Sequence, residues 1–357
     1  MNKSITDQRS QRAHIVFVVT TEVVGGHEHQ AYHVIHDLAQ RAEVTVICPT
    51  QPIADYFADL PCAVVVTNFL QAGKFWQQLR HVPRTARILA PFFATADKVI
   101  VSGGAVVATL GPVYACKWLN REMTCIAYVP AYTDRALTHG VVGSVYNWIV
   151  DRLARRPDAY CTINRIQAAI FRKRFGRNVI VLPNKIRTVA APAESFGKRL
   201  VYVGRFDEES KDLSNLVAML DVPENPYTTL LMIGAGPAED ALKRLAASAR
   251  HIEISFLPWL NAQEMDSKIG QDDCLIMNSR WEGEPLVVRE FIARKLPAIT
   301  KNVAGFRFIV PKAFRFEGQD QLLAILNRVY RLDRAEAARG LPRIRTRREN
   351  ALQLLLA

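Results

Sequence analysis

The chain has 357 residues, of which 49% are hydrophobic, and a formal net charge of +12. This length is enough for two ordinary hydrophobic cores, so two domains are expected. No uninterrupted apolar run approaches the roughly 20 residues that a transmembrane helix needs. The excess of positive charge indicates anionic partners, such as nucleic acid, phosphorylated substrates or an acidic membrane surface.

The cysteines and the first residues point to the compartment. The six cysteines occur singly, without a CxxC pair, and most lie in apolar runs. This pattern predicts reduced, buried thiols rather than a disulfide framework or a zinc site. The segment from Met1 to Arg12 is polar and does not resemble a secretory signal peptide. We therefore expect a cytoplasmic protein.

Short apolar segments rich in Val, Ile or Leu recur along the chain and alternate with segments of helical periodicity. Apolar strands joined by helical crossovers predict α/β domains with parallel sheets covered on both faces. The expected strands are His14–Thr20, Val44–Cys48, Ala63–Asn68, Lys98–Val101, Thr124–Val129, Ala159–Ile163, Val179–Leu182, Leu200–Val203, Thr228–Ile233, Ile252–Leu257, Cys274–Met277 and Pro297–Thr300.

A stretch without clear periodicity, Pro183 to Lys198, is the expected linker. It divides the chain into a first domain of residues 1–190 and a second of residues 191–330. The rest of the chain, residues 331–357, is expected to form a helical tail with many arginines that can pack back on the first domain.

A Gly-Gly pair follows the first expected strand and precedes a helix that runs through Gln40. Adjacent glycines, here Gly25 and Gly26, let backbone amides approach a phosphate closely at a helix start. A plain flexible turn explains an isolated pair equally well. The histidines of this helix, at positions 27, 29, 33 and 36, lack the H-E-x-x-H pattern, and no carboxylate or cysteine completes a metal site.

Two cations follow the first expected strand of the second half. Gly204 ends this strand, Arg205 follows at once, and Lys211 comes six residues later, at the expected start of the next helix. Arg offers a planar fork for phosphate oxygens and Lys a mobile point charge, so together they suit a diphosphate. Taken singly, either residue is more simply explained as a surface cation.

The next glycine turn, Gly234-Ala-Gly236-Pro-Ala-Glu239, begins like a dinucleotide fingerprint. Glu239 stands where the third glycine belongs, and the turn follows the second strand of its domain rather than the first. A nicotinamide cofactor is therefore not expected.

The most informative stretch runs from Asn278 to Glu290, directly after an apolar strand. The chain turns at Glu282-Gly283, and Pro285 suits the first position of a helix. A helix start is an anion site because of its free N–H groups and dipole. Two carboxylates around such a site, Glu282 and Glu290, suit a sugar nucleotide, whereas two glutamates at this spacing alone fit an ordinary exposed helix.

The order of these motifs resembles a known family. Gly-Gly after the first strand, then G-R-x5-K-D, L-x-I-G-x-G-P, E-G-x-P-x4-E and L-P-A-I-T, is similar to the group 1 retaining glycosyltransferases of family 4. The match covers nearly the whole chain and is strongest from Val201 to Gly305. The resemblance implies the GT-B fold, in which two Rossmann-like domains face each other across a cleft and the second binds most of the donor.

The resemblance also implies substrates. The donor would be a nucleoside-diphosphate sugar, a UDP- or GDP-sugar, with no further cofactor and no metal. The acceptor would be a glycan or a lipid-linked molecule in the synthesis of surface polysaccharide or glycoconjugates. Transfer would retain the anomeric configuration, with no dedicated protein nucleophile.

Carried over residue by residue, the resemblance implies that Arg205 and Lys211 hold the diphosphate and that Glu282 binds hydroxyls of the transferred sugar. We expect catalysis to depend on these three residues. Glu290 would bind the ribose, and Pro258 and Trp259 would lie beside the base. The remaining donor contacts would come from backbone at the turns and at the helix start, namely Gly25, Gly26, Gly204, Gly283, Leu286 and Val287.

One feature departs from the family pattern. Many members have a histidine at the end of a first-domain strand, facing the donor sugar. Here that region reads Ala127-Tyr-Val-Pro130-Ala-Tyr132-Thr133-Asp134, without a histidine. Either Tyr132, Thr133 or Asp134 takes its role, or the sugar contact differs.

Two other classes of protein fit the sequence less well than a transferase does. A 2-epimerase on the same fold would need catalytic carboxylates in the first domain, where Glu22, Glu28 and Asp134 are too few to indicate one. A nucleic-acid-binding protein would fit the charge, but no reading motif or aromatic platform is present. No nucleic acid is therefore expected as a partner.

Membrane contact is a further expectation. An apolar stripe at helical spacing is interpreted as packing on the sheet. It consists of Val142, Val145, Tyr146, Ile149 and Leu153, with Trp148 beside it. Eight cations against two aspartates follow between residues 151 and 177. Clustered cations predict peripheral binding to the anionic inner face of the membrane. The cations are Arg152, Arg155, Arg156, Arg165, Arg172, Lys173, Arg174 and Arg177.

Overall fold

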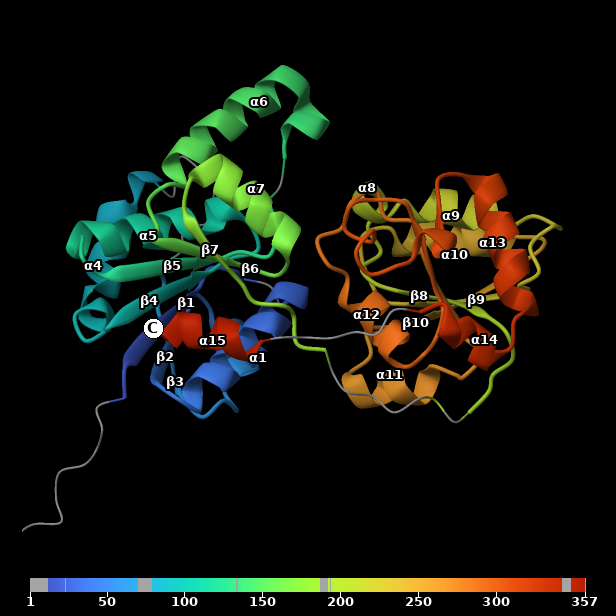
Figure 1. Ribbon diagram of the computed structural model, residues 1–357, viewed down its shortest axis with the longest axis horizontal. Coiled ribbons are helices and arrows are strands. Elements are labelled where there is room, and N and C mark those ends of the chain that lie inside the picture. The colour runs from blue at the N-terminus through green and yellow to red at the C-terminus, as the bar shows by residue number, and fades with distance from the viewer. Residues whose placement is uncertain are drawn as a thin grey trace, which may run out of the picture. The chain divides into compact units, whose positions relative to one another are not determined.

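The computed structural model describes residues 12–22, 24–69, 79–132, 134–186, 192, 194–341 and 348–356. They pack as two compact units (Figure 1). The first unit consists of the residues up to Lys185 together with those from Arg348, and the second of the residues from Ile186 to Leu341. The predicted boundary between residues 190 and 191 lies outside the described residues.

In the described part of the first unit, a seven-stranded parallel sheet has the order β3-β2-β1-β4-β5-β6-β7 (Figure 1). Side chains of β1 alternate between the two faces, so that Phe17 lies in one hydrophobic cluster and Val16 and Val18 in another. The strands are β1 (His14–Val19), β2 (Glu43–Cys48), β3 (Ala63–Val66), β4 (Lys98–Ser102), β5 (Thr124–Tyr128), β6 (Ala159–Thr162) and β7 (Asn178–Val181).

Helices cover both faces of this sheet. One face is packed by α1 (Gly26–Ala39), α2 (Gln51–Phe57) and α15 (Glu349–Leu356). The other is packed by α4 (Val82–Phe93), α5 (Val106–Leu119) and α7 (Arg165–Phe175), with α6 (Ala136–Leu153) against α5 and α7. Local chemistry sets the ends of these helices. Asn164, for example, accepts the first free N–H groups of α7, and Gly176 ends it in the left-handed conformation (φ 62°).

The described part of the second unit contains a six-stranded parallel sheet in the order β10-β9-β8-β11-β12-β13, built around one hydrophobic cluster. The strands are β8 (Leu200–Val203), β9 (Thr229–Ile233), β10 (Glu253–Leu257), β11 (Cys274–Met277), β12 (Ala298–Lys301) and β13 (Arg315–Phe316). The helices are α8 (Glu208–Lys211), α9 (Leu213–Leu220), α10 (Glu239–Ser248), α11 (Ala262–Lys268), α12 (Leu286–Ala293), α13 (Gln319–Arg331) and α14 (Arg334–Arg339), with a 3-10 turn, η1 (Lys312–Phe314).

The predicted α/β class with parallel sheets is confirmed in both units. All of the expected strands form within two residues of their predicted ends, and the short edge strand β13 was missed. In each sheet the strand order reverses once, between β1 and β4 and between β8 and β11. The carboxyl ends of strands at such a reversal are where doubly wound sheets bind ligands. No helix among the described residues is both long and apolar enough to span a membrane.

The helix α15 completes the core of the first unit, although it follows the whole second unit in the chain. It lies against α1 and β7, and its residues Leu352 and Leu355 are buried among core side chains. The buried ammonium of Lys98 donates a hydrogen bond of 2.9 Å to the carbonyl oxygen of Leu355. Arg348 pairs with Asp37 of α1 at 3.2 Å.

This packing predicts a contrast between two leucines of the same helix. Replacing buried Leu352 with Ala leaves a cavity, so we expect the free energy of unfolding to fall by about 2–4 kcal/mol. Leu354, 57% exposed, serves as the matched control, for which Leu354→Ala should change stability by less than about 0.5 kcal/mol. Urea unfolding followed by fluorescence measures both. Equal effects of the two substitutions would contradict the docking of α15.

Candidate active site

At the carboxyl ends of β8 and β11, two loops meet at the reversal of the second sheet. The loop after β8 begins with Gly204 and Arg205 and leads into the one-turn helix α8. The loop after β11 begins with Asn278 and leads to α12. The backbone N–H of Arg280 donates to the carbonyl oxygen of Ser210 at 2.8 Å, so the two loops are joined directly.

The structure places Lys211 differently from the sequence prediction. It is the last residue of α8, not the first of the next helix. Asp207 starts α8 by accepting hydrogen bonds from the N–H groups of Glu209 and Ser210 at 3.0 and 3.4 Å. Because α8 is a single turn, it carries Lys211 back toward the loop after β11.

Lys211 and Glu282, 71 positions apart in the chain, form an ion pair. The Nζ atom of Lys211 lies 2.5 Å from Oε1 of Glu282, and the two side chains are 16% and 12% exposed. The hydroxyl of buried Ser279 donates to the same carboxylate oxygen at 2.7 Å. The cation predicted to bind the diphosphate and the carboxylate predicted to bind the sugar are therefore in direct contact.

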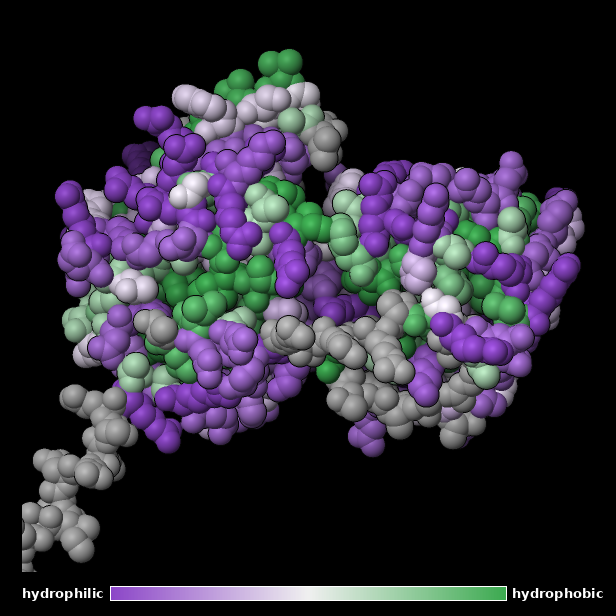
Figure 2. Space-filling model, viewed as in Figure 1, coloured by the Kyte–Doolittle hydropathy of each residue, from purple (hydrophilic) through white to green (hydrophobic). Residues whose placement is uncertain are grey.

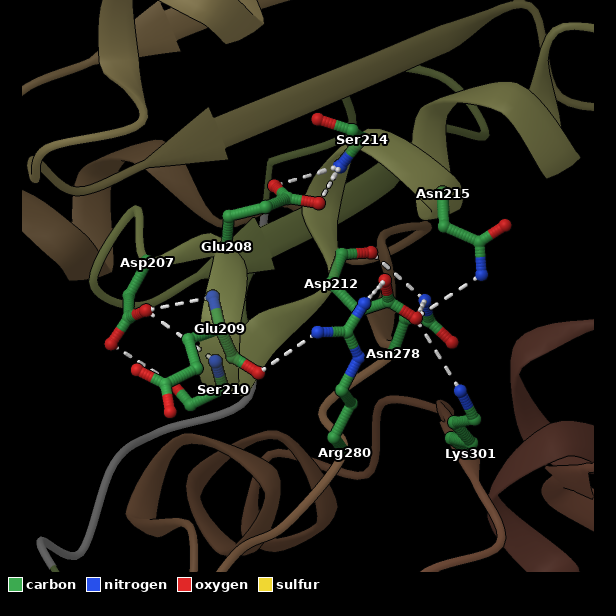
Figure 3. Close-up of polar contacts among 10 residues, drawn as sticks. All are labelled: Asp207, Glu208, Glu209, Ser210, Asp212, Ser214, Asn215, Asn278, Arg280 and Lys301. Atoms are coloured by element: carbon green, nitrogen blue, oxygen red, sulfur yellow. Dashed lines mark hydrogen bonds and ion pairs between the residues drawn. The ribbon is translucent and has the colours of Figure 1, made fainter. Parts of the chain in front are cut away.

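The next residue after Lys211, Asp212, has a buried carboxylate that contacts three segments, namely α9, the loop after β11 and β12 (Figure 3). Its Oδ1 atom accepts from Arg280 at 2.6 Å, and its Oδ2 atom accepts from Asn215 and from Asn278, both at 3.1 Å. The ammonium of Lys301 lies 3.5 Å from Oδ2. The same amide of Asn278 also donates to the backbone oxygen of Asp212 at 2.9 Å.

Asp212 sits between α8 and α9 with a left-handed backbone (φ 55°), a conformation that non-glycine residues seldom adopt. The contacts of its side chain stabilise this turn. Burial alone would raise its pKa, but the hydrogen bond from Asn215 and the charges of Arg280 and Lys301 lower the pKa below its ordinary value. Glu208 adds a further contact, because its carboxylate accepts the N–H of Ser214 near the start of α9 (Figure 3).

Glycines let these loops pack backbone against backbone. Gly234 has φ 151°, and a Cβ there would lie 2.0 Å from the carbonyl oxygen of Gly204. Gly236 has φ 159°, and a Cβ there would lie 2.4 Å from the carbonyl oxygen of Phe206. The fingerprint-like glycines thus support the loop that carries Arg205. A Cβ on Gly305 would lie 2.2 Å from the carbonyl oxygen of Glu282, so a side chain there would displace the site.

The other predicted donor residues of the second unit lie in the loops after β8 and β10 and in or just before α12. Arg205 is 66% exposed and lies 3.2 Å from Asp207. The buried hydroxyl of Tyr202 donates to the backbone oxygen of Arg205, and burial together with the charges of Glu282 and Asp207 raises the Tyr202 pKa. Four further residues are half-buried near or within α12, namely Gly283, Leu286, Val287 and Glu290, while Pro258 and Trp259 are exposed just after β10.

The helix α12 begins at Leu286, because Pro285 is its N-cap with extended backbone, not its first helical residue as predicted. Glu290 is therefore the fifth residue of the helix. One pair was not foreseen. Arg289 and Glu284 form a close, largely buried ion pair between the two motif carboxylates, and burial raises the pKa of Glu284.

In the first unit, the Gly-Gly turn starts α1. Gly25 is the N-cap, Gly26 is the first helical residue, and the carboxylate of Glu28 accepts the N–H of Gly25 at 2.9 Å. Burial raises the pKa of Glu28. This carboxylate therefore caps the helix, which weakens the case for Glu28 as a catalytic group of an epimerase.

The sequence interpretation missed His27. Its Nε2 atom lies 2.9 Å from the hydroxyl of Ser102, where β4 ends, and its ring packs against Tyr128, where β5 ends. Burial lowers the pKa of His27 to about 4, so the ring is neutral at pH 7. Among the described residues, no three His, Cys, Asp or Glu side chains gather as a metal site would require.

The suggested replacements for the family histidine are bound to other groups. The hydroxyl of Tyr132 donates to Asp151 at 2.9 Å. Asp134 accepts from Asn147 at 2.6 Å and from Arg174 at 2.9 Å. Thr133 lies outside the described residues.

The sequence of the chain is similar to a known family and to one known protein. The family described as glycosyl transferases group 1 matches residues 191–319, which span most of the second unit. A protein described as an uncharacterized 41.2 kDa protein in the cps region of Klebsiella pneumoniae is 24% identical over 133 residues, and the match spans 36% of each chain. This chain therefore aligns with about a third of the length of that relative.

Solved structures share the fold over almost the whole chain. The lipopolysaccharide outer core galactosyltransferase WaaB, in its apo form, has a TM-score of 0.65 at 18% identity and covers 92% of this chain and 94% of its own. HepE from Anabaena, solved with UDP and glucose, has a TM-score of 0.69 at 14% identity over 96% and 98%. Sucrose-phosphate synthase from Thermosynechococcus elongatus has a TM-score of 0.68 at 14% identity over 97% and 95%.

The fold of the chain is the GT-B fold of these glycosyltransferases, as the resemblance implied. The match to the glycosyl transferases group 1 family lies within the second unit of this fold.

The contacts of Asp212 predict a stability effect that depends on pH. Asp212→Asn should lower the free energy of unfolding by about 1–3 kcal/mol at pH 7, because it removes the charge that holds Arg280 and Lys301 while Arg280 is partly screened by solvent. The folded-state pKa of Asp212 is lowered, so this stabilisation is present above the ordinary aspartate pKa and is lost as the pH falls through the lowered value.

Urea unfolding at neutral and acidic pH measures the effect, with Asp240→Asn at the exposed start of α10 as a control. The difference between Asp212→Asn and the wild type should shrink on acidification. A difference that stays constant down to pH 3 would exclude a charge effect.

Proposed function

We propose that the protein transfers a sugar from a nucleoside-diphosphate sugar to a glycan or lipid-linked acceptor with retention of anomeric configuration. The observation that carries this proposal is the pairing of Lys211 with Glu282 at the reversal of the second sheet. A cation for the diphosphate and a carboxylate for the sugar are held within 2.5 Å of each other. A donor whose diphosphate is bonded to the sugar needs both groups side by side.

The proposed reaction needs no acidic or basic side chain to transfer a proton. The bond between the anomeric carbon and the diphosphate breaks, the acceptor oxygen bonds to the same face of that carbon, and the acceptor proton passes to the departing diphosphate. Negative charge therefore grows on the diphosphate. Lys211, Arg205 and the N–H groups of Leu286 and Val287 would stabilise it electrostatically. Glu282 would orient the sugar through its hydroxyls.

The charge of Lys211 is balanced by the carboxylate of Glu282. Binding of a diphosphate would give Lys211 a new anionic partner and free the carboxylate for hydroxyl groups. Ser279 would continue to orient Glu282, because its hydroxyl is buried and already bonded to the carboxylate. The network of Asp212 would keep the end of α8 in place during this exchange.

For the nucleotide we propose uridine diphosphate. HepE was solved with UDP and glucose. An E. coli structure described as trehalose-6-phosphate bound with UDP-2-fluoro glucose shares the fold, with a TM-score of 0.66 at 12% identity. A GDP-sugar remains the other candidate. The relative in a cps region supports a place in surface polysaccharide synthesis. The sugar transfer would take place in the cytoplasm, at the inner face of the membrane.

The donor can be identified by thermal shift with UDP-, GDP- and ADP-sugars. A donor at about 100 times its dissociation constant should stabilise the protein by roughly 2.7 kcal/mol. Release of nucleoside diphosphate and NMR of the product then separate transfer with retention from transfer with inversion and from 2-epimerisation. Absence of a shift with every sugar nucleotide would refute the proposal.

Substitutions at the two carboxylates and at Lys211 should have different effects. Glu282→Gln should lower turnover on the order of 10²-fold with little change in nucleoside-diphosphate affinity, because its contact is with the sugar. Glu290→Ala should weaken the nucleoside diphosphate itself. Lys211→Ala should weaken the diphosphate by roughly 1.5–3 kcal/mol and the monophosphate less.

Isothermal titration and initial-rate kinetics measure these effects. Lys243→Ala is the matched control, since Lys243 also pairs with a glutamate, Glu239 at 2.7 Å, but on the exposed surface of α10. It should leave both measurements unchanged. Turnover unchanged by Glu282→Gln would rule out its assignment to the sugar.

A further inference from the structure

The outer face of α6 is apolar and exposed, contrary to the expectation that its stripe packs on the sheet. Val141, Val142, Val145 and Trp148 are 80%, 76%, 55% and 66% exposed. Figure 2 shows hydrophobic residues gathered at the outer end of the first unit, over α6. Single exposed apolar residues are common on proteins, but a contiguous apolar face on one helix marks an interaction surface.

The spacing of these residues shows that the exposed face is continuous. Residues 141, 145, 148 and 152 are three or four positions apart and therefore lie in a row along one side of the helix. The predicted stripe is divided between two sides. Tyr146, Ile149 and Leu153 pack partly against the core of the first unit, whereas Val142 and Val145 do not. Core packing thus accounts for the inner face of α6 and leaves the outer one unexplained.

Two glycines shape this helix. Gly140 interrupts it with φ 53°, which is suited to glycine. Gly143 lets it approach its own first turn, because a Cβ there would lie 2.1 Å from the carbonyl oxygen of Arg135. The helical row of exposed apolar residues begins directly after Gly140.

Positive charge continues the apolar row. Arg152 follows Trp148 by one turn, and Arg155 and Arg156 come directly after the helix, all three exposed. None of them forms an ion pair with a described carboxylate. Trp118, 62% exposed at the end of α5, is close to the same end of α6, because Tyr114 of α5 donates to the carbonyl oxygen of Leu153 and lies under the guanidinium of Arg156.

The carboxylates near α6 are turned away from this face. Asp134 and Asp151 both pair with Arg174 at 2.9 Å, and the guanidinium of Arg174 also covers the ring of Tyr132. Arg174, which the sequence interpretation assigned to the membrane, therefore pairs with these two carboxylates instead. Arg172 and Arg177 donate to backbone oxygens of Val179 and Arg155. The cations placed best for an outside partner are those at the end of α6.

We infer that the outer face of α6 inserts into the interfacial region of a lipid bilayer that contains anionic headgroups, with Val141, Val142, Val145 and Trp148 among the acyl chains. Arg152, Arg155 and Arg156 contact the lipid phosphates. An amphipathic helix with Trp on its apolar face and arginines beside it fits the boundary between headgroups and acyl chains. The inference rests on the proposed place of work at a membrane, but not on the chemistry of transfer.

A bilayer explains these features better than a protein partner does. Valines and a tryptophan with few polar groups between them offer little hydrogen bonding to a specific partner. The cations are grouped at one end of the apolar row, as expected where headgroup phosphates lie beside acyl chains. The chain as a whole has a formal net charge of +12, which favours approach to an anionic surface.

Sedimentation with vesicles tests the inference on the full-length protein. We expect binding to vesicles of phosphatidylcholine with 30% phosphatidylglycerol, a composition chosen for the assay, and binding at least about tenfold weaker to phosphatidylcholine alone. The double substitution of Val145 and Trp148 by Ser should lower the partition coefficient by at least about tenfold. The triple substitution of Arg152, Arg155 and Arg156 by Ser should lower it by about fivefold per cation and remove its dependence on salt.

Matched controls separate the face from general effects. Phe308→Ser removes an exposed apolar side chain of the second unit, 59% exposed, and should leave binding unchanged. Replacing Lys243, Arg250 and Lys312 by Ser removes the same charge from exposed positions of the second unit and should reduce binding much less. Trp148 fluorescence should shift to the blue on binding, which a distant contact would not produce.

Each outcome decides. Binding that is lost in the α6 variants alone supports the inference. No binding to anionic vesicles, or binding that the α6 variants retain, overturns it, as does a dimer by light scattering that the Val145 and Trp148 substitutions dissolve. Donor hydrolysis without vesicles should be the same in all variants. If the wild-type protein does not hydrolyse any donor, this would instead count against the proposed function.

Discussion

The site of the second unit depends on one buried negative charge. Asp212 adopts a left-handed backbone that residues other than glycine seldom adopt, and the contacts of its carboxylate hold it there. Apart from that of Asn215, these contacts come from segments that are 66 to 89 positions further along the chain. Together with the backbone hydrogen bond from Arg280 to Ser210, they fix the end of α8 against the loop after β11. Lys211 and Glu282 meet because this charge holds both segments.

The glycines of the second unit also hold its loops close together. Gly234 and Gly236 resemble a cofactor motif in the sequence, but each allows a neighbouring backbone to come closer than any side chain would permit. Gly305 does the same for Glu282. Close packing of loops at the carboxyl ends of parallel strands therefore sets the position of polar groups whose chemistry is carried by only a few side chains.

The sequence predicted what local periodicity and single motifs can encode. Strands were found because apolar runs of four to six residues are visible without a partner, whereas β13, with two residues, has no periodicity to detect. Lys211 was placed at the wrong end of a helix, because α8 has four residues and its single turn leaves no helical pattern. The links from Asp212 to Arg280 and Lys301 join distant residues, and one sequence contains no signal for them.

The two apolar stripes show a second limit. Periodicity marks α6 as amphipathic, but it does not say whether the apolar face is turned inward. In α15 the stripe is buried by the first unit, while in α6 only one side is. Whether an apolar helix face points inward depends on which surfaces of the sheet the other helices leave uncovered. This is a property of the whole unit.

The position of α15 also affects how the chain folds as it is made. Residues 348–356 leave the ribosome after the entire second unit, yet they cover part of the core of the first. Domains generally fold as they are synthesised, beginning with the first. Here the first unit emerges early with an apolar surface over α1 and β7 still open, and the second unit, which is continuous in the chain, can complete its core before the first does. The core of the first unit can therefore be completed only after the whole second unit has been synthesised.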